Sequence, residues 1–157
     1  MIIVQVFLKS KYKSGEKNPH LGHLLMVFSK ATGYGIRALA YLARQTDLRL
    51  CGLNEIAVSE RIPPEYLRKL LAELRRHRIV QSVKGVHGGY LLALAPEKIS
   101  LWDVFRVLDH DPYLDECILC LSRDEDPSCP FCGEWKRIRD DLVAVLKNKT
   151  IADFATD

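Results

Sequence analysis

The spacing of apolar residues predicts three helices over residues 30–76. Apolar positions recur with a helical period in 30–44, in 53–60 and again from Pro64 onward. Pro63 and Pro64 separate the second helix from the third, because proline stops one helix and suits the first turn of the next. The third helix has one core stripe with the spacing i, i+3, i+4 and i+7, formed by Leu67, Leu70, Leu71 and Leu74.

After residue 77 the pattern changes to that of strands. Apolar runs at 79–83 and 90–94 flank a turn that contains Gly85, Gly88 and Gly89, as in a β-hairpin. Two short helices, a longer basic helix and a glycine-tipped hairpin predict a winged helix-turn-helix, in which the third helix enters the major groove of DNA. The alternative is a small α+β domain whose third helix is basic only for solubility.

A fourth helix is expected to begin at Ser100, which can form a capping box with Asp103. Its expected apolar side consists of Trp102, Phe105 and Leu108. A longer helix is expected over 134–148, and Thr150 and Asp153 are expected to cap a short turn after it. The fold class that follows is mainly α with a small β-hairpin wing.

The longer helix over 134–148 carries apolar residues at alternating spacings of three and four. This coiled-coil seam consists of Trp135, Ile138, Leu142 and Val145. It predicts that the helix packs lengthwise on another helix, either in a second copy of the chain or in the chain's own first helix. We therefore expect a winged helix-turn-helix domain joined to a long dimerisation helix.

The first 25 residues differ from the rest in composition. They contain four lysines among Ser, Gly, Asn and Pro, too little apolar content for a packed element. We expect residues 1–25 to be a disordered extension or to precede an alternative start at Met26. The remaining divisions are a DNA-binding domain over 26–95, a connecting helix and cysteine loop over 96–133, and a dimerisation helix with its C-terminal turn over 134–157.

The formal net charge of +3 hides an asymmetry along the chain. Residues 26–95 hold 11 Lys/Arg against 5 Asp/Glu, whereas residues 96–132 hold 3 against 9. A basic first half suits DNA phosphates, although a solvated basic face has the same composition. No apolar run approaches the roughly 18 residues of a membrane span, and no secretory signal pattern is present, so we expect a cytoplasmic protein without a membrane partner.

Four of the five cysteines form the pattern Cys-x2-Cys-x8-Cys-x2-Cys. They are Cys117, Cys120, Cys129 and Cys132. Disulfides are rare in a reducing cytoplasm, and two residues between cysteines let both thiolates of a pair reach one ion or cluster edge. Zinc and an iron–sulfur cluster both accept four thiolates, and the spacing does not separate them. The fifth cysteine, Cys51, is expected to pack as a small hydrophobic residue.

Several sequence blocks resemble the IscR/NsrR-type (Rrf-two) transcriptional regulators. The resemblance runs from about Ser29 to Phe154 and rests on the order of its motifs. They are Ser29-Lys30 with Tyr34, Leu53-Asn54-Glu55-Ile56-Ala57, the block from Ile62 to Leu71, the block from Val83 to Leu92, and Thr150-Ile151-Ala152-Asp153-Phe154. The resemblance implies a winged-helix homodimer on a pseudo-palindromic operator of double-stranded DNA, with an iron–sulfur cluster (2Fe–2S or 4Fe–4S) in many members. Zinc is the alternative occupant.

The cysteine loop departs from that family's pattern. The usual middle ligand has moved to Cys120, and Arg123 sits near its usual place. Cys132 falls where some members have a histidine, and Gly33 stands where some have an acidic ligand. Both departures suggest that four thiolates of one chain complete the site without a residue from a second subunit.

The expected DNA contacts lie on the third helix, the hairpin and the first helix. They are Lys30, Glu65, Tyr66, Arg68, Lys69, Lys84 and His87. The resemblance places base-reading residues at Glu65 and Arg68, and a carboxylate can accept from cytosine while arginine can pair with guanine. Lysines suit phosphates, which position the protein without specifying sequence. The alternative for each residue is a solvated surface side chain.

The sequence shows no arrangement typical of an enzyme. It lacks paired carboxylates at useful spacing, a phosphate-binding glycine loop and a nucleophile with a placed base. A Cys-x2-Cys pair can exchange disulfides, but the thioredoxin-like βαβ context is missing. The expected function is a DNA-binding transcriptional regulator that senses redox state, oxygen, nitric oxide or iron–sulfur status through the cysteine site.

Overall fold

The computed structural model describes residues 29–45, 49–85, 88–109, 114, 117, 119–120 and 126–155. Its elements, in chain order, are α2 (Lys30–Ala43), α3 (Leu53–Glu60), α4 (Pro64–Arg76), β1 (Val80–Val83), β2 (Gly89–Leu92), η1 (Pro96–Lys98), α5 (Leu101–Leu108), α6 (Cys132–Asn148) and η3 (Ile151–Phe154). The prediction of a mainly helical fold with a small hairpin is confirmed. The predicted extension over 1–25 lies outside the described residues.

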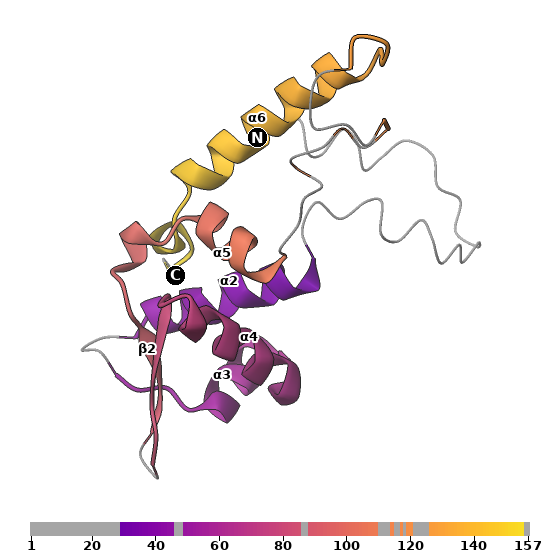
Figure 1. The fold of residues 1–157 in the computed structure, drawn as a ribbon. Coiled ribbons are helices and arrows are strands. Elements are labelled where there is room, and N and C mark those ends of the chain that lie inside the picture. The colour runs from indigo at the N-terminus through magenta and orange to yellow at the C-terminus, as the bar shows by residue number, and fades with distance from the viewer. Residues whose placement is uncertain are drawn as a thin grey trace, which may run out of the picture.

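Helices α2, α3 and α4 form a compact body with the hairpin beside it (Figure 1). The Ser29 side chain caps α2 by accepting from the backbone N–H groups of Ala31 and Thr32. Helix α3 ends at Arg61, which has a left-handed backbone (φ 52°), and Pro64 opens α4. These local signals place the boundaries of both helices where the sequence predicted them.

The predicted leucine stripe of α4 faces the core. Leu67, Leu71 and Leu74 are fully buried and Leu70 nearly so. The same core receives residues from the other helices and from the hairpin, among them Leu39, Ile56, Val80 and Val104. Because one face of α4 is held in this way, its polar residues are left on the opposite, solvent-exposed face.

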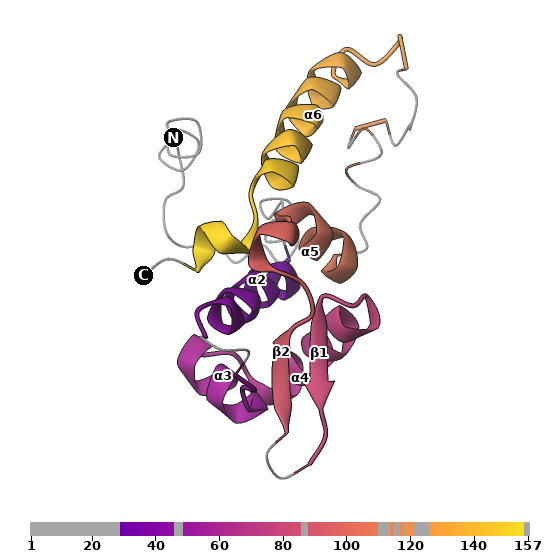
Figure 2. The ribbon, with the colours of Figure 1, turned by 90° about the vertical axis from the view of Figure 1, so that its left-hand side faces the viewer.

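Strands β1 and β2 pair antiparallel, with Val80 opposite Leu92 and Val83 opposite Gly89. Each strand has four residues where five were predicted: β1 begins one residue later, and β2 begins one residue earlier and ends two residues earlier. The Ala93 N–H donates to the Ile79 carbonyl at 2.9 Å just outside the ladder. The hairpin projects from the body next to α4, as a wing does (Figure 2). Residues 86–87 at its tip lie outside the described residues.

Helix α5 begins with the predicted capping box, in which Asp103 accepts from the Ser100 N–H and Ser100 Oγ accepts from the Asp103 N–H. Its buried residues are Leu101, Val104, Phe105 and Val107. Of the predicted apolar side, Phe105 is buried, while Trp102 and Leu108 are half-buried and pack against the core. The apolar face is wider than predicted, because α5 packs against both α2 and α4.

Helix α6 extends away from the rest of the molecule (Figures 1 and 2). It begins at Cys132, two residues before the predicted start at 134, and its 17 residues span about 25 Å. Near its C-terminal end, Leu146 is buried and Leu142 packs against the core, while the helix contacts α5. Among the described residues, the side chains of α6 that join this core therefore lie near its C-terminal end.

The chain then returns to the body through η3, which packs against α2. The predicted cap is confirmed, since Asp153 accepts from the Thr150 N–H at 2.8 Å. An isolated bridge pairs Ser100 with Thr150 and anchors this turn beside the start of α5. Among the described residues, no helix combines the length and the apolar character needed to cross a membrane.

Candidate DNA-binding surface and metal centre

The first two turns of α4 present four of the predicted DNA contacts to solvent. All four are exposed: Glu65, Tyr66, Arg68 and Lys69. The exposed fraction of the side chain is 83% for Glu65 and 59% for Arg68. Arg68 Nη2 lies 3.7 Å from Glu65 Oε1, so the two predicted base-reading groups pair loosely with each other. At such exposure this ion pair contributes little to stability, which leaves both groups free to exchange partners.

The start of α4 is held against α2 by an aromatic contact. The rings of Tyr34 and Tyr66 meet edge to face with centroids 5.8 Å apart, and the Arg37 guanidinium lies 5.8 Å from the Tyr34 centroid. Tyr34 is half-buried, so it connects the core helix to an exposed residue of α4. Lys30, another predicted contact, is exposed one turn before Tyr34 on α2.

The wing is tied to the end of α4. Arg75 Nη1 donates to Ser82 Oγ on β1 at 3.2 Å, and Lys84 follows β1 with an exposed side chain. The remaining predicted wing contact, His87, lies outside the described residues. The structure therefore brings Glu65, Tyr66, Arg68 and Lys69 onto one helix face, and it puts Lys84 on the adjoining hairpin.

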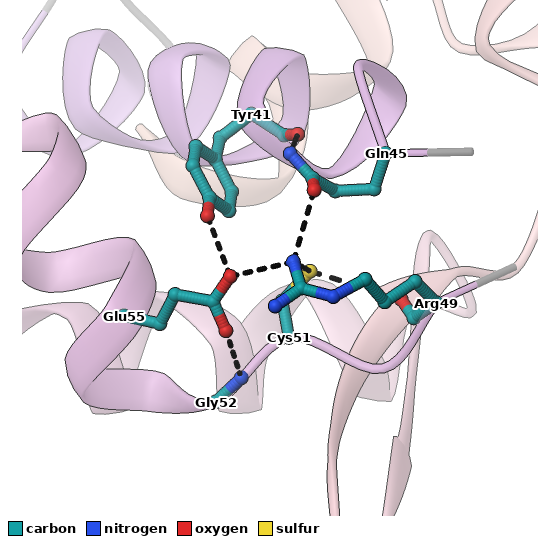
Figure 3. Close-up of polar contacts among 6 residues, drawn as sticks. All are labelled: Tyr41, Gln45, Arg49, Cys51, Gly52 and Glu55. Carbon is teal, nitrogen blue, oxygen red and sulfur yellow. Dashed lines mark hydrogen bonds and ion pairs between the residues drawn. The ribbon is translucent and has the colours of Figure 1, made fainter.

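A polar cluster at the junction of α2 and α3 centres on Glu55 (Figure 3). Glu55 Oε1 accepts from Tyr41 Oη and from Arg49 Nη1, both at 2.7 Å, and Oε2 accepts from the Gly52 N–H at 3.3 Å. Arg49 Nη1 also donates to Gln45 Oε1 at 3.0 Å. Hydrogen bonds from Tyr41 and Arg49 hold the pKa of the Glu55 carboxyl below its usual range, so this group stays ionised at neutral pH.

The segment beside this cluster is also a neighbour of the wing. The Cys51 N–H donates to the Tyr90 carbonyl at 3.0 Å, and the Tyr90 N–H donates to the Cys51 carbonyl at 2.9 Å. A Cβ at Gly89 would lie 2.7 Å from the Cys51 carbonyl oxygen, which explains why glycine occupies that position. Cys51 is fully buried, as predicted, and burial raises the pKa of its thiol.

The end of α5 is linked to the start of α2. Asp109 Oδ2 accepts from the Ser29 N–H at 3.1 Å, and Asp109 Oδ1 accepts from the Ser29 hydroxyl. Nearby, a Cβ at Gly35 would lie 2.3 Å from Leu108 Cδ1, so α2 and α5 are in close contact here. The two helices are therefore joined at the point where the chain leaves α5 for the cysteine segment.

The four predicted metal ligands converge. The Sγ atoms of Cys117, Cys120, Cys129 and Cys132 all lie within 4.8 Å of one another. The Cys117 and Cys132 residues are buried and the other two are half-buried. A tight turn, in which the Cys132 N–H donates to the Cys129 carbonyl at 3.3 Å, directs the second pair, and Cys132 is also the first residue of α6.

Two of the four thiols, those of Cys117 and Cys132, have pKa values shifted in opposite directions. Backbone N–H groups of Cys120 and Leu119 donate to the Cys117 sulfur and lower its pKa to about 7. The Cys120 and Cys132 sulfur atoms lie 3.1 Å apart. This thiol–thiol contact, together with burial, raises the pKa of Cys132 to about 12. Metal ions bind thiolates, so binding of an ion by these four cysteines would release protons.

The junction cluster was not foreseen from the sequence. Glu55 is the third residue of α3, a position where an acidic side chain commonly caps a backbone N–H. This position is the one sequence signal that could have predicted a polar contact of Glu55. Arg49 and Tyr41 belong to the cluster through tertiary contacts only. The Arg75–Ser82 and Tyr34–Tyr66 contacts were missed for the same reason, because no local pattern links a helix to a partner in another element.

Together, the exposed polar face of α4, the helix-turn-helix formed with α3 and the adjoining hairpin define a winged helix-turn-helix DNA-binding protein. Residues 28–157 match the Rrf2 family, described as an iron-dependent transcriptional regulator. The chain belongs to the Rrf2 family of transcriptional regulators.

Relatives and solved structures agree with this assignment. The chain is 35% identical over 132 residues to a protein of Aquifex aeolicus described as an HTH-type transcriptional regulator. The match covers 82% of this chain and 91% of that protein. The structure of CymR, the global cysteine regulator of B. subtilis, is similar with a TM-score of 0.73 and 30% identity, covering 85% of this chain and all of that one. IscR of T. potens is similar with a TM-score of 0.65 and 27% identity, covering 84% and 88%.

Proposed function

We propose that the chain is a dimeric regulator that binds a pseudo-palindromic operator and responds to the state of a metal centre held by its four cysteines. The observation that carries this proposal is the presence, in one chain, of an exposed recognition face on α4 and a separate set of four convergent thiols. The recognition face would contact DNA, and the four thiols would bind a metal whose presence or state can change.

In this proposal the residues of α4 and the wing divide the work of binding. Glu65, Tyr66 and Arg68 lie where side chains of a recognition helix reach base edges, and Arg68 suits guanine. Lys69, Lys84 and Lys30 contact phosphates and set the register of the protein on the duplex. His87 belongs to the wing tip in the same scheme. The DNA-binding unit is assigned to residues 26–95.

The exposed part of α6 supports the dimer. Ile138 and Val145 keep 48% and 57% of their surface although both are apolar and lie on the predicted seam. The same helix carries Cys132 at its first residue, so the cysteine site adjoins the proposed interface. An ion that fixes the cysteine segment to the start of α6 would order the seam. Occupancy would in this way favour the dimer and thus operator binding.

Two occupants of the site are considered. An iron–sulfur cluster is supported by the description of the family as iron-dependent, and it would supply sensitivity to oxygen, nitric oxide or redox state. Zinc is supported by the closeness of the four sulfur atoms, and it would supply a structural link between the two cysteine pairs. In both cases Cys117, Cys120, Cys129 and Cys132 are the ligands.

The test of the regulatory function is selection of binding sites from a pool of random duplexes, using the full chain purified without oxygen. The expected result is a sequence with two-fold symmetry whose half-sites are separated by about one helical turn or a multiple of it. Selection of no sequence, or of an asymmetric one, would contradict the proposal. Wild-type protein that sediments as a monomer at micromolar concentration would contradict the dimer.

A further inference from the structure

From the positions of the four sulfur atoms we infer that the cysteine site of this chain takes a single four-coordinate metal ion and not an iron–sulfur cluster. The inference rests on the metal centre of the proposed function and specifies its nuclearity. It concerns Cys117, Cys120, Cys129 and Cys132, whose sulfur atoms lie within 4.8 Å of one another.

A single tetrahedral ion requires short distances between its ligands. With metal–sulfur bonds of about 2.3 Å, the sulfur atoms at the corners of the tetrahedron are about 3.8 Å apart. The limit of 4.8 Å for all four sulfur atoms lies close to this value. The Cys120 and Cys132 sulfur atoms, which are 3.1 Å apart, have to separate by under about 1 Å to admit such an ion. Side-chain adjustment alone can provide that movement.

A cluster requires a wider arrangement. Its cysteines are divided among two or four irons, and thiolates on different irons lie on the order of 6 Å apart because each points outward from its own iron. Some of the sulfur pairs here would have to move apart by more than 1 Å beyond the 4.8 Å limit. The Cys132 N–H donates to the Cys129 carbonyl at 3.3 Å and Cys132 begins α6, so the second pair is held on a hydrogen-bonded backbone.

The donor set and its surroundings also suit a closed, four-coordinate site. Zinc sites with four cysteines are structural and leave no open position. The described carboxylates on either side of the second pair are both occupied elsewhere. Asp126 Oδ1 accepts from the Ser128 N–H at 2.8 Å and from Ser128 Oγ at 2.6 Å, and Glu134 Oε2 accepts from Arg137 Nη2 at 2.9 Å. Four thiolates from one chain therefore complete the coordination without another residue.

The consequence for regulation is a change in the kind of signal. A single ion links the segment of Cys117 and Cys120 to the first turn of α6, where Phe131 stacks on Trp135 with ring centroids 6.5 Å apart. The signal is then the presence or loss of the ion, through its availability or through oxidation of the thiolates. Disassembly of a cluster is not required.

The inference is tested on full-length protein purified anaerobically, by measuring zinc, iron and acid-labile sulfide per chain. The expected result is one zinc or one iron per chain with no sulfide. Metal-free protein titrated with Co²⁺ should bind one ion per chain and show the absorption of a tetrahedral tetrathiolate site. Iron and sulfide in comparable amounts would overturn the inference while leaving the metal-controlled regulator intact.

Matched variants separate ligand loss from general damage. Cys120→Ser should lose the stoichiometric ion and the Co²⁺ absorption, whereas Cys51→Ala, which alters a buried cysteine outside the site, should keep both. Equal retention in the two variants would overturn the ligand assignment. Failure of wild-type protein to bind any of these ions would overturn both the inference and the proposed metal centre. A bound ion without effect on operator affinity would contradict only the proposed control.

Discussion

Tyr41 on α2 donates its hydroxyl to the Glu55 carboxylate on α3 at 2.7 Å, and Arg49 donates to the same oxygen at the same distance. This shared acceptor fixes the segment before α3, whose Cys51 pairs through its backbone with Tyr90 of the wing. Glu55 therefore holds α2, α3 and the wing in one arrangement, although it lies on neither α4 nor the hairpin.

Replacing Glu55 with Ala should loosen the wing. The variant removes the carboxylate that accepts hydrogen bonds from Tyr41, Arg49 and the Gly52 N–H. Its free energy of unfolding should fall by about 1 kcal/mol. Since Lys84 on the wing is a proposed phosphate contact, the slope of log affinity against log salt should fall by about one unit. Salt titration of operator binding, together with thermal unfolding, measures both effects.

Glu60→Ala is the matched control for Glu55→Ala. Glu60 also ties α3 to α2, accepting from Arg44 at 2.7 Å and from Arg37 at 3.4 Å, and both of these partners belong to the α2 segment and not to the segment that pairs with the wing. It should lower stability by a similar amount and leave the salt slope unchanged. Equal slopes for the two variants would show that Glu55 does not position the wing.

The α6 seam should mediate dimerisation through its exposed residues. Ile138→Glu and Val145→Glu each place a charge in the proposed interface and should weaken the dimer roughly tenfold or more. Leu142→Glu is a poorer test, because Leu142 also packs against the chain's own core. Sedimentation across a range of protein concentrations measures the dissociation constant.

Ala144→Glu is the control for the seam, since Ala144 is exposed on a different face of α6. It should leave the dimer intact. A dissociation constant unchanged by Ile138→Glu and Val145→Glu would locate the interface elsewhere.

Arg68 and Lys69 should contribute to DNA binding in different ways. Arg68→Ala should cost roughly 1–3 kcal/mol at the operator and relax discrimination at one base pair per half-site, with a smaller effect on scrambled DNA. Lys69→Ala should weaken both duplexes alike and lower the salt slope by about one unit. Titration of each variant on operator and on scrambled duplex measures the contrast. Equal weakening of both duplexes by Arg68→Ala would mean that α4 is only a basic face.

The sequence predicted most element boundaries because they are set locally. Pro64, the Ser100–Asp103 capping box and the Thr150–Asp153 pair each act within a few residues, and the structure places helix starts at all three. The buried leucine face of α4 was also predictable, since helical periodicity alone shows which residues share one face of the helix. The four converging cysteines were found because paired ligands at short spacing constrain one another.

Features that depend on tertiary contact were not predictable in this way. The burial of Val104 beside Phe105 follows from how α5 packs on α2 and α4, where Leu108 also approaches Gly35 closely. The Glu55 cluster joins residues from three segments that share no sequence pattern. The sulfur separations that distinguish one ion from a cluster are likewise a property of the folded loop and not of the cysteine spacing.

The central claim is that the state of the four-cysteine site controls DNA binding by the winged domain. It is tested most directly by comparing the operator affinity of metal-loaded and metal-free wild-type protein, with scrambled duplex and the Cys120→Ser variant measured alongside. The expected result is tighter operator binding by the loaded form, little change on scrambled DNA, and no response to metal in Cys120→Ser. Equal operator affinity of loaded and metal-free wild-type protein would contradict the claim.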